Sequence, residues 1–282
     1  MRVRFWGVRG SVPVPNPNML RYGGNTSCVE ITLSDGTEMI LDAGSGIREL
    51  GTARATHTNS VEVLLTHLHL DHIQGLLFFP PLFDPANHIH VYGPPATGPD
   101  LDQRLARYLS APLSPVDLRE LPAQVEFAAS PYQDWEVGGA RVRAAVVAHR
   151  GVTVGYRISE GDSSVCYLPD HEPALGSELG DADPGWISGI GLAAGASLLI
   201  HDGQYADEEY PDHVGWGHSS VSDAVAFGLR ADAEHLVLFH HDPTHDDRAV
   251  DELGERAAEA WERAGRDPSE VSTAAEGAVV TI

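Results

Sequence analysis

Short apolar runs recur along the whole chain, separated by glycine, proline and polar residues that are typical of turns. Runs of about four to eight residues with alternating or continuous apolar positions indicate half-buried or fully buried strands. The pattern predicts strands at residues 2–6, 28–33, 38–41, 61–65, 88–92, 141–147, 153–159, 164–168, 197–200 and 235–239.

Apolar residues three or four positions apart predict helices between these strands and near the end of the sequence. The predicted helices span residues 47–53, 100–110 and 221–231. Ser220 with Asp223 is close to a capping box for the third helix, and Thr244 with Asp247 gives a fourth helix a similar start. The buried face of this last helix is expected to contain Val250, Leu253, Ala257 and Trp261.

A chain of 282 residues with 42% hydrophobic residues can bury one large core. It has no repeat of fixed period, no low-complexity tract and no evident interdomain linker, so residues 1–282 are expected to form a single domain. No apolar run approaches the roughly 18 residues of a membrane span. The segment Met1–Gly7 has no apolar signal core, so a cytoplasmic location is the default expectation. Cys28 and Cys166 lie in apolar runs and are expected to be buried thiols, not ligands.

Charge narrows the choice of substrate. The chain has 41 acidic and 18 basic residues, a formal net charge of −23, and every basic residue is arginine. Proteins that bind nucleic acid without sequence preference normally present basic patches that displace counterions from phosphates. The acidic balance therefore argues against broad nucleic-acid binding and favours a small substrate. An RNA end held by an additional surface is the alternative.

Ligand-type side chains cluster in residues 66–72, Thr-His-Leu-His-Leu-Asp-His, directly after an apolar run. Because side chains alternate along an extended chain, His67 and His69 point the same way. Asp71 and His72 can then direct a second pair of ligand atoms toward an adjacent ion. A solvated polar loop is the other interpretation, but clustered His and Asp residues in this order favour a metal site.

This segment resembles the His-x-His-x-Asp-His signature of the metallo-β-lactamase superfamily. The resemblance implies an α/β fold, a four-layer αββα sandwich in which two groups of strands lie between outer helices. It also implies two divalent metal ions per chain, with further ligands at strand ends downstream. His149, Asp170 and His240 each end or follow an apolar run and match those positions.

The resemblance also implies how the ligands are shared. One ion is assigned to His67, His69 and His149, the other to Asp71, His72 and His240, and Asp170 bridges them. Imidazole-rich sites with carboxylate oxygen suit zinc first, and also manganese or iron. His241 competes with His240 for the last position, and alternation sends the two to opposite faces. His240 is preferred because it directly follows the apolar run, and His241 is expected at the mouth of the site.

Two further segments resemble ribonuclease Z and the related cyclic phosphodiesterases. Asp202, in His-Asp-Gly-Gln-Tyr, and His218, in Gly-His-Ser-Ser, occupy the places of that group's carboxylate and histidine. A carboxylate orients an imidazole and raises its basicity, so the imidazolium can contact a phosphoryl oxygen or protonate a leaving alkoxide. The residues expected to act in catalysis are His218, Asp202 and Asp71. Asp202 is shorter than the glutamate of the tRNA-processing enzymes, which makes the contact distance critical.

Other segments are expected to surround the site. Residues 5–13 and 22–28 resemble the glycine-rich start of the same group, where backbone amides can receive an anion. Asp42 is expected to support the histidine loop, because ligating imidazoles need a partner for their other nitrogen. The aromatic residues that could stack on a base or simply pack are Phe78, Phe79, Phe83, Tyr205, Tyr210 and Trp216.

The spacing of the later ligands bears on the substrate. Residues 150–169 leave room for a hairpin, and not for the RNA-gripping arm of long-armed ribonuclease Z enzymes. With the acidic charge, this favours a metal-dependent hydrolase of small phosphodiesters, cyclic nucleotides first. The alternatives are a tRNA 3′ processing endonuclease, a lactam or thioester hydrolase of the same superfamily, and a non-catalytic scaffold. The resemblance is also compatible with a homodimer.

Overall fold

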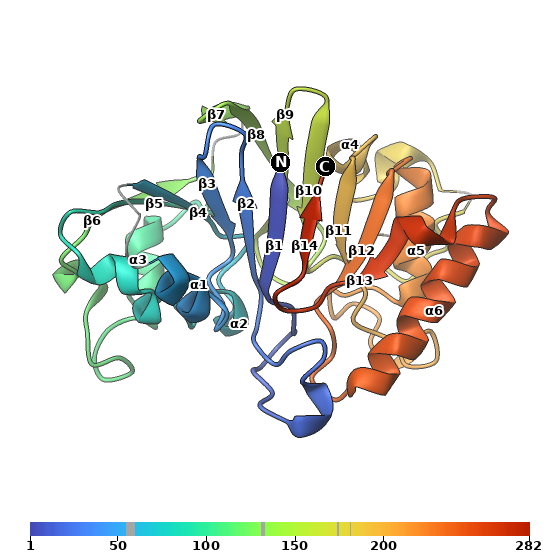
Figure 1. The fold of residues 1–282 in the computed structure, drawn as a ribbon, viewed down its shortest axis with the longest axis horizontal. Coiled ribbons are helices and arrows are strands. Elements are labelled where there is room, and N and C mark those ends of the chain that lie inside the picture. The colour runs from blue at the N-terminus through green and yellow to red at the C-terminus, as the bar shows by residue number, and fades with distance from the viewer. Residues whose placement is uncertain (55–59, 131–132, 174, 181) are drawn as a thin grey trace.

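Two seven-stranded β-sheets pack face to face at the centre of the molecule (Figure 1). This computed structural model describes residues 1–54, 60–130, 133–173, 175–180 and 182–282. The first sheet contains, in spatial order, β14 (Val279–Thr281), β1 (Arg2–Gly7), β2 (Cys28–Thr32), β3 (Glu38–Leu41), β4 (Ser60–Leu64), β5 (His88–Gly93) and β6 (Gln124–Ala129). The second contains β13 (Val271–Thr273), β12 (His235–Phe239), β11 (Leu198–Asp202), β10 (Ser163–Leu168), β9 (Thr153–Glu160), β8 (Ala140–Val147) and β7 (Trp135–Val137).

Helices cover the outer face of each sheet (Figure 1). The first sheet is flanked by α1 (Ile47–Arg54), α2 (Leu70–Ile73) and α3 (Leu101–Leu105), and the second by α4 (Ile190–Ala193), α5 (Val221–Arg230) and α6 (Asp247–Arg263). Short 3-10 turns are η1 (Pro17–Met19), η2 (Leu76–Phe78), η3 (Pro80–Phe83), η4 (Leu118–Glu120), η5 (Pro184–Trp186), η6 (Tyr210–Asp212) and η7 (Pro268–Glu270). The predicted αββα sandwich is confirmed. No helix in the described ranges is long and apolar enough to cross a membrane.

Each sheet combines antiparallel and parallel strands. Strands β3, β4, β5 and β6 run parallel, as do β10, β11, β12 and β13. Because β8 and β10 both pair antiparallel with β9, they run in the same direction as each other. The carboxyl ends of β8, β10, β11 and β12 therefore meet at one edge of the second sheet, which is where α/β proteins commonly place their ligands.

Large apolar side chains fill the space between the sheets. Phe5 and Ile31 reach it from the first sheet, Tyr167 and Phe239 from the second, and none is more than 1% exposed. The Phe239 ring centroid lies 6.2 Å from that of Phe5 and 5.7 Å from that of Tyr167. A second apolar cluster joins the second sheet to its helices, and a third joins the first sheet to its helices. Every layer is thus held to the next by buried apolar surface, the main favourable term in folding.

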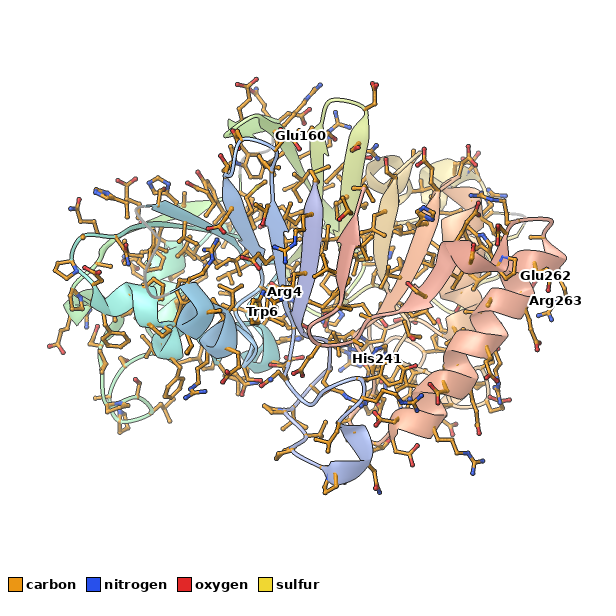
Figure 2. The ribbon with its side chains drawn as sticks, viewed as in Figure 1. Arg4, Trp6, Glu160, His241, Glu262 and Arg263 are labelled. Carbon is orange, nitrogen blue, oxygen red and sulfur yellow. The ribbon has the colours of Figure 1, made fainter. Side chains whose placement is uncertain are left out.

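Strand β1 lies in the interior of the first sheet, between β14 and β2. The amino group of Met1 donates a hydrogen bond to the carbonyl of Ile282 at 2.9 Å, so the two labelled ends in Figure 1 lie next to each other. On the outer face of β1, the Arg4 guanidinium lies 4.0 Å above the Trp6 ring (Figure 2). The Trp6 indole N–H donates to Glu30 at 2.9 Å.

All strands predicted from the apolar runs are present, within a few residues of the expected boundaries. The pattern missed β6, β7, β13 and β14. Three of these have only three residues, too few to show a period of two, and β6 has mostly exposed or half-buried positions. Pairing with a neighbouring strand, and not local sequence, defines them.

Two helix predictions need correction. The helix predicted over residues 100–110 ends at Leu105, because the chain then turns and the amide of Leu118 pairs back to the carbonyl of Leu109. The last helix begins at Asp247 and not at Thr244. Its capping side chain is Asp246, which accepts from the amide of Ala249 at 2.9 Å, whereas Thr244 bonds to Asp242. The Ser220 cap is confirmed, since Ser220 accepts from the amide of Asp223 at 3.0 Å.

Trp261 gives a test of the outer packing. It is fully buried between α6 and the second sheet, and its indole N–H donates to Glu270 at 2.9 Å. Trp261→Ala is expected to lower the free energy of unfolding by about 3–5 kcal/mol, because it leaves a large cavity. Urea titration followed by circular dichroism measures the change. Trp186, which is 87% exposed, supplies the matched control; Trp186→Ala should change stability by less than about 0.5 kcal/mol. Equal losses in both variants would contradict the packing.

Candidate metal centre

The candidate metal ligands come from both sheets. Residues 66–72 follow β4 of the first sheet, and α2 begins inside this motif at Leu70. His149, Asp170 and His240 follow β8, β10 and β12 of the second sheet. All seven predicted ligands lie in two adjoining groups, which are His67, His69, His149 and Asp170, and Asp71, His72 and His240. Within each group the ligand atoms are within 4.8 Å of one another.

Asp170 lies between the two groups. Its Oδ2 atom is 3.6 Å from Nε2 of His67 and also 3.6 Å from Nε2 of His149. Its Oδ1 atom is 3.0 Å from Nε2 of His72 and 3.4 Å from Nε2 of His240. Each carboxylate oxygen therefore faces a different group, which is the arrangement expected of a bridging ligand.

The second group is equally compact. Nε2 of His240 is 3.2 Å from Oδ2 of Asp71, and Nε2 of His72 is 3.4 Å from the same oxygen. The backbone amide of Ser11 donates to this oxygen at 2.8 Å. A Cβ atom on Gly10 would lie 2.6 Å from the His240 ring, so glycine is required at this close approach. The glycine-rich N-terminal segment thus packs directly against the candidate site, and one of its amides binds a carboxylate of the chain itself.

The Nδ1 atoms of four candidate ligands have partners outside the two groups. His72 Nδ1 is 2.8 Å from Asp42, as the sequence predicted for that aspartate, and His67 Nδ1 is 3.0 Å from the Thr66 hydroxyl. His149 Nδ1 lies 2.7 Å from the carbonyl of Gly217, and His240 Nδ1 lies 3.0 Å from the side-chain oxygen of Gln204. These partners leave each Nε2 atom directed at the neighbouring ligands, the role of outer partners in metal sites.

The donor set fits a divalent cation. Among the candidate ligands, three buried atoms have no hydrogen-bond partner in the described part of the chain, namely Nε2 of His67, Nε2 of His72 and Oδ1 of Asp170. The last two lie 3.0 Å apart. Buried polar atoms are rarely left unpaired. A cation bound by nitrogen and carboxylate oxygen would satisfy all three.

Electrostatics favour the ligating forms of Asp170 and His67, whereas the charges of Asp170, Asp71 and Asp42 outweigh burial and raise the pKa of His72 well above its usual value. Burial alone would raise the pKa of Asp170, but the imidazoles of His240, His72 and His67 hold it well below its usual range. Burial lowers the pKa of His67 well below its usual value, and the neighbouring His72 lowers it further. The carboxylate is therefore ionised and this imidazole neutral near pH 7, the forms in which these side chains bind metals.

Asp202 and His218 form the predicted pair beside the two groups. His218 Nδ1 lies 2.7 Å from Oδ2 of Asp202, so the shorter aspartate still reaches the histidine. The His218 ring stacks on that of His240, with centroids 5.0 Å apart. Burial disfavours the imidazolium, but Asp202 outweighs this and raises the pKa of His218 to about 9. Near pH 7, His218 is therefore a cation next to the candidate ligands.

Asp202 is itself held by backbone amides. It is fully buried, and it accepts hydrogen bonds from the amides of Gln204 at 3.0 Å, His171 at 3.1 Å and Ser219 at 3.3 Å.

The side chain of Gln204, which faces Nδ1 of His240, was given no role from the sequence. Its position two residues after the end of β11, at the edge where the ligands gather, was the only available signal.

His241 does not lie at the mouth of the site, and that prediction is wrong. The residue is buried, and its Nε2 atom is 2.8 Å from the carbonyl of Ala274 (Figure 2). Burial lowers its pKa to about 3. His240 has a φ of 63°, in the left-handed region, so alternation ends at the strand and His241 turns toward the end of β13.

The aromatic candidates separate into packed and exposed residues. Phe79 and Tyr205 are buried, and Tyr205 stacks on His213 with centroids 4.3 Å apart. Phe78 and Trp216 are 63% and 52% exposed. Trp216 immediately precedes Gly217, whose carbonyl faces His149, so it is the exposed aromatic nearest in sequence to a candidate ligand contact.

Comparison with known proteins agrees with this geometry. Residues 37–241 match the model of the beta-lactamase superfamily domain. Ribonuclease Z of Mycolicibacterium paratuberculosis is 30% identical over 289 residues, covering 90% of this chain and 90% of that one. A diphosphatase of the PhnP family aligns at a TM-score of 0.70 and 18% identity, over 100% of this chain and 97% of that one. The short form of human tRNase Z aligns at 0.67 and 22%, over 100% and 99%. The chain therefore belongs to the metallo-β-lactamase superfamily of hydrolases, among relatives named ribonuclease Z.

Proposed function

We propose that this chain, acting as a single domain over residues 1–282, is a dinuclear metal-dependent phosphodiesterase. Its first substrates are small phosphodiesters such as cyclic nucleotides. The observation that carries the proposal is the position of the Asp202–His218 pair against two adjoining ligand groups, each of which is approached by one oxygen of Asp170. A cationic imidazole next to a metal centre suits the departure of an alkoxide from phosphorus.

The proposed ligands follow the two groups. His67, His69 and His149 would hold one ion, Asp71, His72 and His240 would hold the other, and Asp170 would serve both. This mixture of imidazole and carboxylate favours zinc, with manganese and iron as the alternatives. Bound ions of this kind make water available as a nucleophile near neutral pH and stabilise negative charge on phosphoryl oxygens.

The protein's own groups perform the remaining tasks. His218 holds a proton on the imidazole near pH 7 and gives it to the leaving oxygen. Asp202 fixes the ring through Nδ1, so that Nε2 is the atom that faces the substrate. Asp71 remains a carboxylate, because the neighbouring His72 and His240 lower its pKa against the effect of burial. It therefore contributes negative charge to the metal centre in the working enzyme.

Two features support a small substrate. The net charge of −23 is unfavourable for gripping a long polyanion. The chain between His149 and Asp170 consists of little more than β9 and β10, which form an antiparallel hairpin. This segment therefore has no additional arm that could hold an RNA.

A second candidate is a tRNA 3′ processing endonuclease. It is favoured by the relative named ribonuclease Z, which is 30% identical over 90% of the chain. The same ligands and the same Asp202–His218 pair would cleave an RNA phosphodiester. The two candidate functions differ in the size of the substrate beyond the phosphodiester that is cleaved. Substrate size and the salt dependence of binding therefore distinguish them.

A substrate panel tests the proposal. The metal-free protein is loaded with zinc or manganese, its metal content is measured, and it is assayed on bis-p-nitrophenyl phosphate, cyclic nucleotides, a tRNA precursor, nitrocefin and a thioester. We expect hydrolysis of the small phosphodiesters only when metal is present, and its loss on chelation. Preferential cleavage of the tRNA precursor, with affinity falling steeply as salt rises, would favour the endonuclease. Turnover of nitrocefin or the thioester alone would contradict both.

A further inference from the structure

A buried carboxylate, Glu172, lies behind the loop that carries His218. It is fully buried and stands two residues after Asp170 in the sequence. Its backbone amide donates to the carbonyl of Ala148 at 2.9 Å, directly before His149. Glu172 therefore lies among the candidate ligands without facing either ligand group.

In the described part of the chain, every side-chain hydrogen bond of Glu172 goes to one segment, residues 206–219, which we call the 206–219 loop. Oε1 accepts from the Tyr210 hydroxyl at 3.0 Å and from the amide of Gly215 at 2.8 Å. Oε2 accepts from the amide of Gly217 at 2.8 Å. Both oxygens of this buried side chain therefore take their donors from the 206–219 loop.

The anchored part of the loop contacts the candidate metal centre. The carbonyl of Gly217 accepts from Nδ1 of His149 at 2.7 Å, and His218 is the next residue. Gly217 has a φ of +94°, and a Cβ atom there would lie 2.4 Å from His149 Nδ1. The amide of Gly217 donates to Glu172, and the carbonyl of Gly217 orients His149, one of the proposed ligands. This carbonyl is part of the peptide bond between Gly217 and His218, the proposed general acid.

The surroundings make an anchor necessary. Pro211, Asp212, Val214, Gly215 and Trp216 are exposed, so little apolar burial holds this part of the loop. Loops with few buried contacts occupy several conformations unless polar contacts restrict them. We propose that Glu172 is a positioning residue, which holds Gly217 so that His149 and His218 keep their orientation at the metal centre. The kinetic part of this inference rests on the proposed phosphodiesterase function, and the metal-binding part does not.

Glu172→Gln is the most direct test, because it keeps the shape of the side chain. One acceptor oxygen becomes an NH₂ group, which faces the donor amides of Gly215 or Gly217 and cannot bond to them. We expect the affinity for the zinc ion assigned to His67, His69 and His149 to fall about 10–100-fold, as for other outer partners of metal ligands. Chelator competition and titration calorimetry with zinc alone measure this. In the zinc-saturated enzyme kcat should also fall, with little change in KM, because orientation of His218 matters in the transition state.

Two further variants make the test specific. Tyr210→Phe removes one of the three donors and should change zinc affinity in the same direction by a smaller factor. Glu208→Gln alters a carboxylate of the same loop that is exposed and pairs with Arg256 at 2.8 Å. It should leave zinc affinity and kcat unchanged. If Glu172→Gln fails to fold, the zinc affinity of Tyr210→Phe tests the inference instead.

The outcomes separate this inference from the proposed function. Wild-type zinc affinity and kcat in Glu172→Gln, even with lower thermal stability, would show a structural role only and overturn the inference. It is equally overturned if Glu172→Gln does not fold and Tyr210→Phe leaves zinc affinity unchanged. Should wild type cleave no phosphodiester while Glu172→Gln still weakens zinc binding, the proposed function fails and the positioning role stands.

Discussion

Asp170→Asn is expected to remove high-affinity binding of both ions and to lower kcat/KM on small phosphodiesters by about 10³-fold, the upper range for losing one key electrostatic group. Asp170 is the residue whose two oxygens face the two ligand groups, at 3.0–3.6 Å from the imidazole nitrogens. Asparagine keeps the volume but removes the charge and one acceptor. Metal analysis after gel filtration, together with steady-state kinetics, measures both effects.

The control for this variant is Asp162→Asn. Asp162 is exposed in the turn between β9 and β10, and the change should leave metal content and activity at wild-type levels. Two ions per chain in Asp170→Asn, bound as tightly as in the wild type, would contradict a bridging role. Loss of activity with full metal content would instead place the effect in the chemical step.

His218→Ala is expected to lower kcat by about 10²–10⁴-fold on cyclic nucleotides, the usual contribution of a general acid. The loss should be smaller on bis-p-nitrophenyl phosphate, because nitrophenolate leaves without a proton. Comparing the two substrates therefore distinguishes proton donation from binding. His235→Ala is the matched control, since His235 is exposed at the start of β12 and should have no effect. Equal losses on both substrates would argue against an acid role.

Asp202→Asn tests the same pair through pH. The pKa of His218 is raised to about 9 against the effect of burial, mainly by the charge of Asp202. The imidazolium is therefore present at lower pH and is lost as pH rises through that value. Without the negative charge, the loss should occur at lower pH, so the alkaline limb of the kcat profile moves toward neutrality. An unchanged limb would show that another group titrates there.

The sequence contained most of the candidate site because its ligands follow strands. Residues 66–72 were recognisable from local order, and their resemblance to the superfamily signature then singled out His149, Asp170 and His240, each after an apolar run. Parallel strands of the second sheet bring the later positions to a common edge. The fold was predicted from the resemblance, because composition alone is compatible with other α/β or α+β folds.

The remaining contacts depended on tertiary structure. Gln204 and Glu172 act on partners 36 and 45 residues away, and no local pattern distinguishes them from ordinary polar loop residues. His241 was misplaced because alternation was extended beyond the strand, past the left-handed backbone of His240. The start of α6 depended on whether Thr244 or Asp246 caps the helix, a choice that spacing alone does not resolve.

The origin of the ligands in different sheets has a thermodynamic consequence. Residues 66–72 belong to the half of the molecule built on the first sheet, whereas His149, Asp170 and His240 belong to the other half. With ions bound as proposed, the metal centre cross-links the two halves at one edge of their shared core. Each tenfold rise in free metal above its dissociation constant then adds about 1.4 kcal/mol per ion to the free energy of unfolding. Metal supply would therefore add to the buried apolar surface in holding the two halves of the sandwich together.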